Sequence, residues 1–385
     1  MLNTIAIKNY RSIRELIIPL SSLNVVTGAN GAGKSNLYRA LRLLAETAVG
    51  QAVSSLVEEG GLDSCLWAGP DKVARSCDQV VEGQVRRSSV SLQLGFSADE
   101  GGYLLDFGLP EPVPRTQFGL DPEIKREAIF HSAYYESSTA LVERSGPSLR
   151  ARDDSGRWQH LDQHLPHYES LLSHFGDPRR LPEALHLREW IRTWRFYDQF
   201  RTDRDAPVRR PQVATRTLVL NHDGRDLAAA WQTILEVGDD EALAACLDDA
   251  FPGARVEIRK VQGSFELLFH QPGLLRPLTL AELSDGTLRY LLWIAALLSP
   301  RAAGLMVLNE PENSLHPQLL PPLARLLSLA SGRSQVWVIS HAEQLVRTLF
   351  DSENCQHVGL VKEQGATRWQ DGGLDTTPAW RWLKR

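Results

Sequence analysis

One eight-residue segment constrains the fold of this chain more than any other: Gly28-Ala29-Asn30-Gly31-Ala32-Gly33-Lys34-Ser35. It fits the pattern GxxxxGK[ST], follows an apolar run and precedes a helical pattern. A glycine-rich loop between a strand and a helix can wrap phosphates with its backbone N–H groups. We therefore predict ATP binding, with Lys34 on the β- and γ-phosphates and the Ser35 hydroxyl on Mg²⁺. The expected nucleotide contacts are Asn30, Gly31, Gly33, Lys34, Ser35 and the following Asn36.

The residues around this loop predict strands and one long helix. Apolar runs at 2–8 and 16–27 are bounded by polar turns, which is typical of strands. The helix that opens at the loop is expected to continue through residue 57, and alternation at 80–108 predicts a small antiparallel sheet. One buried stripe supports the helix: Leu37, Leu41, Leu44 and Ala48.

The remaining chain predicts helices and parallel strands. Residues 181–200 have a helical pattern, helices are also expected at 223–250, and two paired strands follow them. The last hundred residues alternate helix and strand, as in a parallel sheet covered by helices. The predicted fold class is therefore α/β: a P-loop fold with a mostly parallel sheet, a small antiparallel β lobe and a helical insertion.

A second apolar run, at 305–308, is followed by Asn309 and Glu310. Open α/β sheets bind ligands at the carboxyl ends of their strands, so Glu310 is a candidate to orient and polarise the attacking water. The alternative is an exposed acid that caps the next helix. Asn309 is the second candidate contact for Mg²⁺, beside Ser35. Its neutral amide lacks the charge that a dication favours, so we expect weaker Mg²⁺ binding or slow turnover.

Two further segments complete the set of motifs. The apolar run at 335–339 ends in Ser340-His341, and His341 is a second catalytic candidate that could reach a γ-phosphate, unless it is only structural. Ser284-Asp285-Gly286-Thr287 begins a helical pattern, with Ser284 a good N-cap. Taken alone, this segment predicts a capped helix.

The order GANGAGKS, LSDGT, NEPE, ISH resembles the ABC-type ATPase heads of the RecF/SMC/OLD group. The start IAIKNYRSI resembles the opening strand of that group, and EPExxLHP at 310–317 is particularly like its RecF-like and OLD-like members. The resemblance implies that Arg11 approaches the nucleotide. It also implies that two protomers sandwich two ATP molecules, with Ser284 and Gly286 of one chain on the γ-phosphate held by the other. We therefore expect an ATP-dependent homodimer.

Departures from the group narrow the resemblance to a stand-alone RecF-like ATPase. We expect no long coiled coil, because no heptad run is long enough, and no Toprim domain, because only 44 residues follow His341. The glutamine that the group places between its lobes is unassigned among Gln84, Gln93 and Gln117. We expect a single ABC-type ATPase domain over 1–385, with lobe I at about 1–125 and 300–385, a helical insertion at about 157–205, and a signature-bearing lobe at about 210–299.

Composition restricts the function further. A net charge of −5 excludes a surface that is basic throughout, although a local basic patch is compatible with it. The four cysteines form no CxxC pair, which favours reduced thiols in the cytoplasm. No run reaches about 18 apolar residues, and the start lacks the features of a signal peptide, so we expect no membrane partner.

Two functions stay open after these exclusions. The first is an ATPase whose dimer closes around DNA in repair or maintenance. The alternative is a nucleotide-dependent interaction switch, for example in phage defence, that recruits a separate protein effector. Asn309 and the expected lack of a nuclease domain favour the switch. A transporter subunit is disfavoured, because such signatures usually contain LSGGQ. Four basic clusters are candidate DNA contacts: Arg86-Arg87, Arg179-Arg180, Arg209-Arg210 and the stretch from Trp190 to Arg195.

Overall fold

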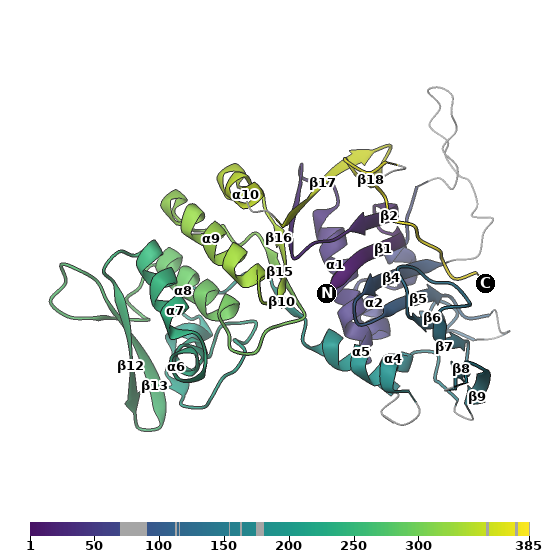
Figure 1. Cartoon of the computed structure of the whole chain (residues 1–385), viewed down its shortest axis with the longest axis horizontal. Coiled ribbons are helices and arrows are strands. Elements are labelled where there is room, and N and C mark those ends of the chain that lie inside the picture. Colours follow the sequence, from purple (N-terminus) through teal and green to yellow (C-terminus); the bar gives the residue numbers. More distant parts are fainter. Residues whose placement is uncertain are drawn as a thin grey trace. The chain divides into compact units, whose positions relative to one another are not determined.

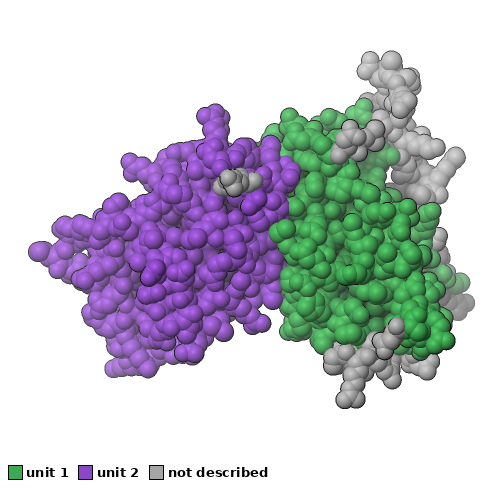
Figure 2. Space-filling model, viewed as in Figure 1, with its two compact units in different colours: residues 1–20, 28–192, 358–385 green, residues 21–27, 193–357 purple. Residues whose placement is uncertain are grey.

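A computed structural model describes residues 1–69, 91–111, 114, 116–153, 155–161, 164–174, 181–351, 354–373 and 376–384. The chain forms two compact units, coloured separately in Figure 2. Unit 1 comprises Met1–Leu20, Gly28–Arg192 and Val358–Arg385, and unit 2 comprises Ser21–Thr27 and Thr193–His357. The lobes expected from the sequence have other boundaries than these two compact units. The lobe assignment stays a prediction.

Unit 1 is built on an eight-stranded antiparallel sheet in the order β2-β1-β4-β5-β6-β7-β8-β9 (Figure 1). The predicted antiparallel lobe is confirmed, and it extends beyond 80–108 as far as residue 161; residues 80–90 lie outside the described part. Strand β5 is buried along its whole length, so the sheet is covered on both faces there. The strands are β1 (Leu2–Tyr10), β2 (Ile13–Pro19), β4 (Leu92–Ala98), β5 (Gly102–Gly108), β6 (Glu123–Phe130), β7 (Ala140–Ser145), β8 (Ser148–Arg152) and β9 (Trp158–Leu161).

The long helix expected after the phosphate loop is two helices, α1 (Lys34–Thr47) and α2 (Ala52–Glu58). The break coincides with Gly50, whose φ of 74° is a left-handed conformation that ends a helix and suits glycine. A short helix, α3 (Leu62–Cys65), follows. The predicted stripe on α1 is confirmed, because all four of its members are buried: Leu37, Leu41, Leu44 and Ala48.

Unit 2 contains the parallel sheet. Strands β10 (Arg195–Tyr197), β15 (Leu305–Asn309), β16 (Gln335–Ile339) and β3 (Leu23–Gly28) are neighbours in that order, and each pair is parallel. Three helices accompany it: α8 (Asp285–Leu297), α9 (Leu320–Ser331) and α10 (Glu343–Phe350), of which α9 packs against the other two (Figure 1).

The helix expected over 181–200 is only partly correct. Helix α5 (Pro182–Arg192) belongs to unit 1, but the residues after it form β10, the edge strand beside β15. Aromatic side chains suit a strand, and the Tyr197 hydroxyl is buried where it donates to the Leu220 carbonyl at 3.0 Å. Tertiary pairing with β15 therefore overrides the local helical pattern.

A second, smaller sheet in unit 2 is confirmed with its helices. Strand β13 (Ser264–His270) pairs antiparallel with β12 (Arg255–Val261), β11 (Gln212–Val213) and β14 (Leu278–Thr279). The remaining elements are α4 (Leu171–His174), α6 (Leu227–Val237), α7 (Asp240–Ala250), β17 (Cys355–Glu363) and β18 (Ala366–Trp369). Strand β17 carries the chain from unit 2 into unit 1, where it pairs antiparallel with β18.

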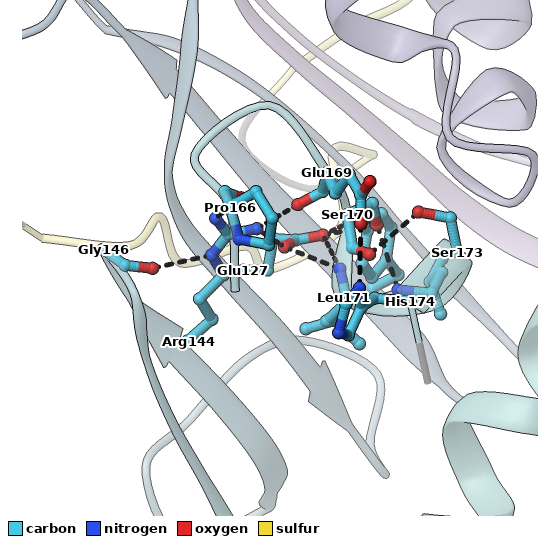
Figure 3. Close-up of polar contacts among 11 residues, drawn as sticks. Glu127, Arg144, Gly146, Pro166, Glu169, Ser170, Leu171, Ser173 and His174 are labelled. Atoms are coloured by element: carbon cyan, nitrogen blue, oxygen red, sulfur yellow. Dashed lines mark hydrogen bonds and ion pairs between the residues drawn. The ribbon is translucent and has the colours of Figure 1, made fainter. Parts of the chain in front are cut away.

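A buried ion pair ties strands of unit 1 to the segment around Ser170 (Figure 3). Glu127 on β6 and Arg144 on β7 have side chains with no exposed area, and their nearest N and O atoms are 2.8 Å apart. The carboxylate also accepts the Tyr103 hydroxyl at 2.5 Å, the Ser170 hydroxyl at 2.6 Å and the Leu171 N–H at 3.0 Å. Both charges are thus hydrogen-bonded, which is the condition for burying them.

We expect Arg144→Met to destabilise unit 1 by about 3–5 kcal/mol, because it leaves the Glu127 carboxylate buried without its cation. Urea denaturation followed by tryptophan fluorescence measures this change. Arg347→Met is the matched control: its ion pair with Glu343 is more than three-quarters exposed on both sides, so its loss should cost at most about 0.5 kcal/mol. Equal effects of the two substitutions would contradict the role given to the buried pair.

Candidate functional site

The phosphate loop lies between the end of β3 at Gly28 and the start of α1 at Lys34, which confirms the predicted strand–loop–helix context. Its glycines have φ angles of 148° at Gly28, 80° at Gly31 and 111° at Gly33. A Cβ at Gly28 would lie 2.4 Å from the Leu360 carbonyl oxygen. Only glycine therefore fits at the first position of the loop.

Lys34 closes the loop on itself. Its side chain is buried, and its Nζ donates to the carbonyl oxygens of Gly28 at 2.6 Å and Ala29 at 3.0 Å. Gly33, at the N-cap position of α1, provides no side-chain cap. The first N–H groups of a helix lack acceptors within the helix, and together with an ammonium group they favour an anion. The loop therefore fits phosphate.

The other predicted contacts of the loop differ in their surroundings. Asn30 and Ser35 are exposed, as nucleotide and Mg²⁺ contacts must be. Asn36 is half-buried and donates its Nδ2 to the Ser12 hydroxyl at 2.7 Å. The Asn36 amide thus has a protein partner, and its contact with nucleotide stays a prediction.

Arg11 has a carboxylate partner within unit 1. Its Nη2 lies 2.7 Å from Glu59 Oε2, which also accepts the Tyr10 hydroxyl at 2.9 Å and the Cys65 thiol at 3.3 Å. Burial opposes ionisation of Glu59, but hydrogen bonds from Arg11 and Tyr10 hold its pKa below the usual value. Burial, with the Glu59 contact, raises the pKa of the Cys65 thiol to about 12. Arg11 is thus ion-paired within unit 1, and its contact with nucleotide stays a prediction.

The register of the parallel sheet aligns the ends of three strands. Asn309 on β15 lies opposite Ile339 on β16, and Ile339 lies opposite Val26 on β3. The chain continues from these ends into Glu310, into Ser340, and through Thr27 into the phosphate loop. Asn309 and Glu310 are therefore at the carboxyl end of a parallel strand, as predicted, and this is where open α/β sheets bind ligands.

Glu310 and His341, the two catalytic candidates, are in direct contact. His341 Nε2 lies 2.9 Å from Glu310 Oε1, and Asn313 donates its Nδ2 to Glu310 Oε2 at 2.7 Å. Both oxygens of the carboxylate are thus held, although 34% of the Glu310 side chain and 39% of the His341 side chain stay exposed. Glu310 has a φ of 50°, a strained angle for a residue with a side chain, which its N–H bond to the Ile339 carbonyl at 2.8 Å helps to maintain.

Sequence reasoning missed Glu312, the second carboxylate of the NEPE string. Its Oε1 accepts the Ser340 hydroxyl at 2.6 Å and the N–H groups of His341 and Ala342 at 2.8 and 3.2 Å. Its Oε2 is buried and has no hydrogen-bond partner among the described residues. Glu312 therefore fixes the backbone that carries His341 and is a positioning residue for it. The sequence signal that could have identified Glu312 is its position two residues after Glu310.

The segment at 284–287 begins α8, as predicted. The Ser284 hydroxyl accepts the Thr287 N–H at 3.2 Å, and Ser284 is exposed. At Gly286 a Cβ would lie 3.1 Å from the Ser314 carbonyl oxygen, so this residue has little room for a side chain. The capped helix is thus confirmed, and action of these residues on a partner's nucleotide stays a prediction.

Arg209 holds the residues that lead into α8. Its guanidinium donates to the carbonyl oxygens of Leu280 at 2.6 Å and Leu283 at 3.0 Å, and to Asp285 Oδ1 at 2.8 Å. All three acceptors belong to the start of α8 or the turn before it. Arg209 therefore stabilises the turn before α8 and the first residue of the helix. Sequence reasoning missed this structural role.

Within the described part of the chain, several members of the basic clusters proposed as DNA contacts have partners inside the protein. Trp194 is buried, Arg195 is half-buried and donates to the Trp194 carbonyl at 2.9 Å, and Trp190 packs on Phe96 with ring centroids 6.0 Å apart. Arg209 has the structural role described above. Arg192 and Arg210 are exposed, and Arg86-Arg87 and Arg179-Arg180 lie outside the described residues. An interleaved aromatic and basic sequence here reflects packing.

Mg²⁺ fits the site only together with phosphate. Within the described ranges, no three His, Cys, Asp or Glu side chains gather into a metal site. Asn309 is half-buried and Ser35 is exposed, so few protein ligands are available. Mg²⁺ keeps several waters and binds through substrate phosphates, which suits such a sparse set of ligands. None of the described helices has the length and apolar character needed to cross a membrane.

The glutamine of the lobe junction is still unassigned. Gln93 is buried in β4, where its Nε2 donates to the Leu383 carbonyl at 3.0 Å, so it serves packing within unit 1. Gln117 is exposed, and Gln84 lies outside the described residues.

Comparison with protein families finds a match over residues 23–347 to a family described as "AAA domain, putative AbiEii toxin, Type IV TA system". No curated protein matches the sequence.

Among solved structures, the chain is similar to an Smc head bound to the C-winged helix domain of ScpA, at 13% identity and a TM-score of 0.51 over 97% of this chain and 98% of that one. An SMC head domain from Thermotoga maritima matches at 13% identity and a TM-score of 0.43, over 97% and 99% of the two chains. A Pyrococcus furiosus Smc head with an extended coiled coil, bound to the C-terminal domain of ScpA, matches at 12% and 0.46, over 95% of each. The first likeness bears on the fold alone and agrees with the predicted α/β P-loop fold.

We expect Lys34→Ala to abolish measurable ATP binding, because it removes the cation that the loop offers to the β/γ-phosphates. Titration with a fluorescent ATP analogue measures this loss, and circular dichroism checks that the fold persists. Lys362→Ala is the control, since Lys362 is an exposed lysine of the same unit. Unchanged affinity in Lys34→Ala would contradict the assignment of the loop.

Proposed function

The chain belongs to the AAA-domain family whose model spans residues 23–347, a family of P-loop ATPases, and we propose that it hydrolyses ATP with Glu310 as the residue that orients the attacking water. The observation that carries this proposal is the 2.9 Å contact between Glu310 and His341 at the ends of neighbouring parallel strands. The third strand of that row, β3, leads directly into a phosphate loop.

In this proposal each residue has one task. The Glu310 carboxylate accepts a hydrogen bond from the water and draws its proton toward itself as the water attacks the γ-phosphorus. His341 keeps the carboxylate oriented from one side and Asn313 from the other, and the His341 ring would be the residue of this pair that contacts the γ-phosphate. Glu312 holds the backbone of His341 in place. Lys34 and the N–H groups of the loop neutralise the phosphates.

Ser35 and Asn309 would be the protein's contacts for Mg²⁺, Ser35 through its hydroxyl and Asn309 through its amide oxygen or a water. When bound, the ion neutralises phosphate charge. An amide at 309 offers the ion an oxygen without a full negative charge. We therefore propose an ATPase with a slow turnover.

Glu310→Gln should leave ATP binding intact and lower phosphate release by about 100-fold or more, because an amide cannot take the proton of the water. Phosphate release and nucleotide titration, measured on the same preparation, separate the two steps. Glu343→Gln is the matched control, because this glutamate on α10 is 79% exposed and pairs with Arg347. Release at the wild-type rate from Glu310→Gln would mean that another residue orients the water.

We further propose that ATP joins two copies of the chain. The support is the exposed start of α8: Ser284 is accessible there, and Arg209 donates hydrogen bonds to the Leu283 carbonyl and the Asp285 carboxylate on either side of it. A preorganised helix start with free N–H donors is suited to a phosphate presented by another molecule. Each protomer would then supply Ser284 and Gly286 to the nucleotide of its partner, in a symmetric dimer.

A mixing experiment tests this dimer. Lys34→Ala lacks the phosphate loop cation but keeps α8, and Ser284→Arg has the reverse defect, so each alone should be inactive. A mixture should recover up to about half of the wild-type activity per heterodimer, because one of its two composite sites is intact. Light scattering with ATP measures assembly beside it. No recovery together with no ATP-dependent dimer would leave a P-loop ATPase that does not work in trans.

Two cellular roles remain for such an ATPase. The first is DNA repair or maintenance, in which the closed dimer holds DNA. The second is a switch that recruits a separate protein, and two observations favour it. Four of the described residues expected to contact DNA are packed or hydrogen-bonded within the units, namely Trp190, Trp194, Arg195 and Arg209, and the family description refers to a toxin of a toxin–antitoxin system. The Smc head of similar fold was itself solved bound to a domain of ScpA. Salt-sensitive DNA retention by ATP-bound Glu310→Gln would favour the first role, and an ATP-dependent dimer that retains no DNA would favour the second.

A further inference from the structure

A chain of three hydrogen bonds runs behind the phosphate loop in unit 1. Asn36 Nδ2 lies 2.7 Å from Ser12 Oγ, Ser12 Oγ lies 2.6 Å from Thr367 Oγ1, and Thr367 Oγ1 lies 2.8 Å from the Ala32 carbonyl oxygen. The participants come from four places: α1, the turn between β1 and β2, strand β18 and the loop itself. Thr367 is 1% exposed and Ala32 is 3% exposed.

The chemistry of the two ends fixes the direction of every bond in this chain. A carbonyl oxygen only accepts, so Thr367 donates to Ala32; an amide nitrogen only donates, so Asn36 donates to Ser12. The Ser12 hydroxyl must then donate to Thr367. Each hydroxyl gives one hydrogen bond and receives one. The Thr367 N–H also donates to the Ser12 carbonyl at 2.7 Å, which joins the two segments through their backbones as well.

The bond to Ala32 sets the orientation of one peptide group of the loop. In a trans peptide the carbonyl oxygen and the following N–H point in opposite directions. With the Ala32 carbonyl turned toward Thr367, the Gly33 N–H is turned away from Thr367. Gly33 has a φ of 111°, and glycine tolerates the flipped peptide nearly as well as the observed one. The backbone alone therefore leaves this peptide free to turn over.

Thr367 also determines the space at Gly33. A Cβ built on Gly33 would lie 2.1 Å from Thr367 Oγ1 and 2.8 Å from its Cγ2. The threonine side chain is thus packed directly against the glycine. Its hydroxyl selects one orientation of the peptide and its methyl group fills the space behind it.

We propose that Thr367, oriented by Ser12, is a positioning residue for nucleotide binding: it locks the Ala32–Gly33 peptide so that the Gly33 N–H is available to a phosphate. This inference rests on nucleotide binding at the proposed loop. Without the lock, only a fraction of molecules holds the binding conformation, and the apparent affinity falls by that fraction. The role belongs to a residue that lies 335 positions after Ala32 in the sequence.

The experiment compares ATP affinities of four proteins by calorimetry well below their unfolding temperatures. Thr367→Val removes the hydroxyl at nearly constant shape and should weaken ATP binding by about tenfold, because it leaves the Ala32 carbonyl without its donor. Thr367→Ser keeps the hydroxyl and should bind within about twofold of the wild type. Thr47→Val is the matched control: Thr47 is equally buried and donates to the Leu44 carbonyl at 2.6 Å near the other end of α1. Its loss should lower thermal stability and leave affinity unchanged.

A second variant tests the inference if Thr367→Val folds poorly. Ser12→Ala keeps the Thr367 hydroxyl but removes the group that orients it, so it should weaken binding by a smaller factor, about threefold. Wild-type affinity in both Thr367→Val and Ser12→Ala, with the wild-type chain binding ATP, would overturn this inference alone. An equal loss of ATP affinity in Thr47→Val would mean that the effect of Thr367→Val reflects general stability, and it would also overturn the inference. A wild-type chain that binds no ATP would overturn the proposed function and this inference together.

Discussion

The hydrogen-bond register of three parallel strands is the constraint on which the candidate site depends. Pairing of β15 with β16 and of β16 with β3 places Asn309, Ile339 and Val26 in one row. Because successive strands end at the same level, the residues that follow them start at one edge of the sheet. A shift of one residue in β16 would move Ser340 and His341 away from Glu310 and Glu312, and it would also turn the buried side chains of the strand outward. Core packing and site geometry thus require the same register.

The two carboxylates that follow β15, Glu310 and Glu312, have different surroundings. Glu310 has both oxygens in contact with side chains that are themselves partly exposed, so it is fixed and still accessible. Glu312 instead uses one carboxylate oxygen to accept hydrogen bonds from a hydroxyl and two backbone N–H groups. A carboxylate that accepts several donors is a rigid support, because each additional bond limits its rotation. Two acids separated by one proline therefore serve different purposes.

The sequence predicted well those parts whose signals are local. The phosphate loop, the strand before Glu310 and the N-cap at Ser284 each depend on a few consecutive residues, and the structure has them as expected. Parts that depend on distant partners were not predictable. Residues 195–197 form a strand because β15 lies beside them, and Arg209 is a brace because its acceptors are the carbonyls of residues more than 70 positions later. Charge counted along a sequence does not reveal whether a guanidinium faces solvent or a row of carbonyls.

The distance in sequence between Ser12 and Thr367 also has a consequence for synthesis of the chain. These hydroxyls are 355 residues apart, and β18 is synthesised long after the phosphate loop. At about 5–20 residues per second, the phosphate loop emerges on the order of tens of seconds before the strand that packs behind it. During that interval the loop is present without its support. On the inference that Thr367 holds the Ala32–Gly33 peptide, a chain that is still being synthesised would bind ATP more weakly than the folded protein.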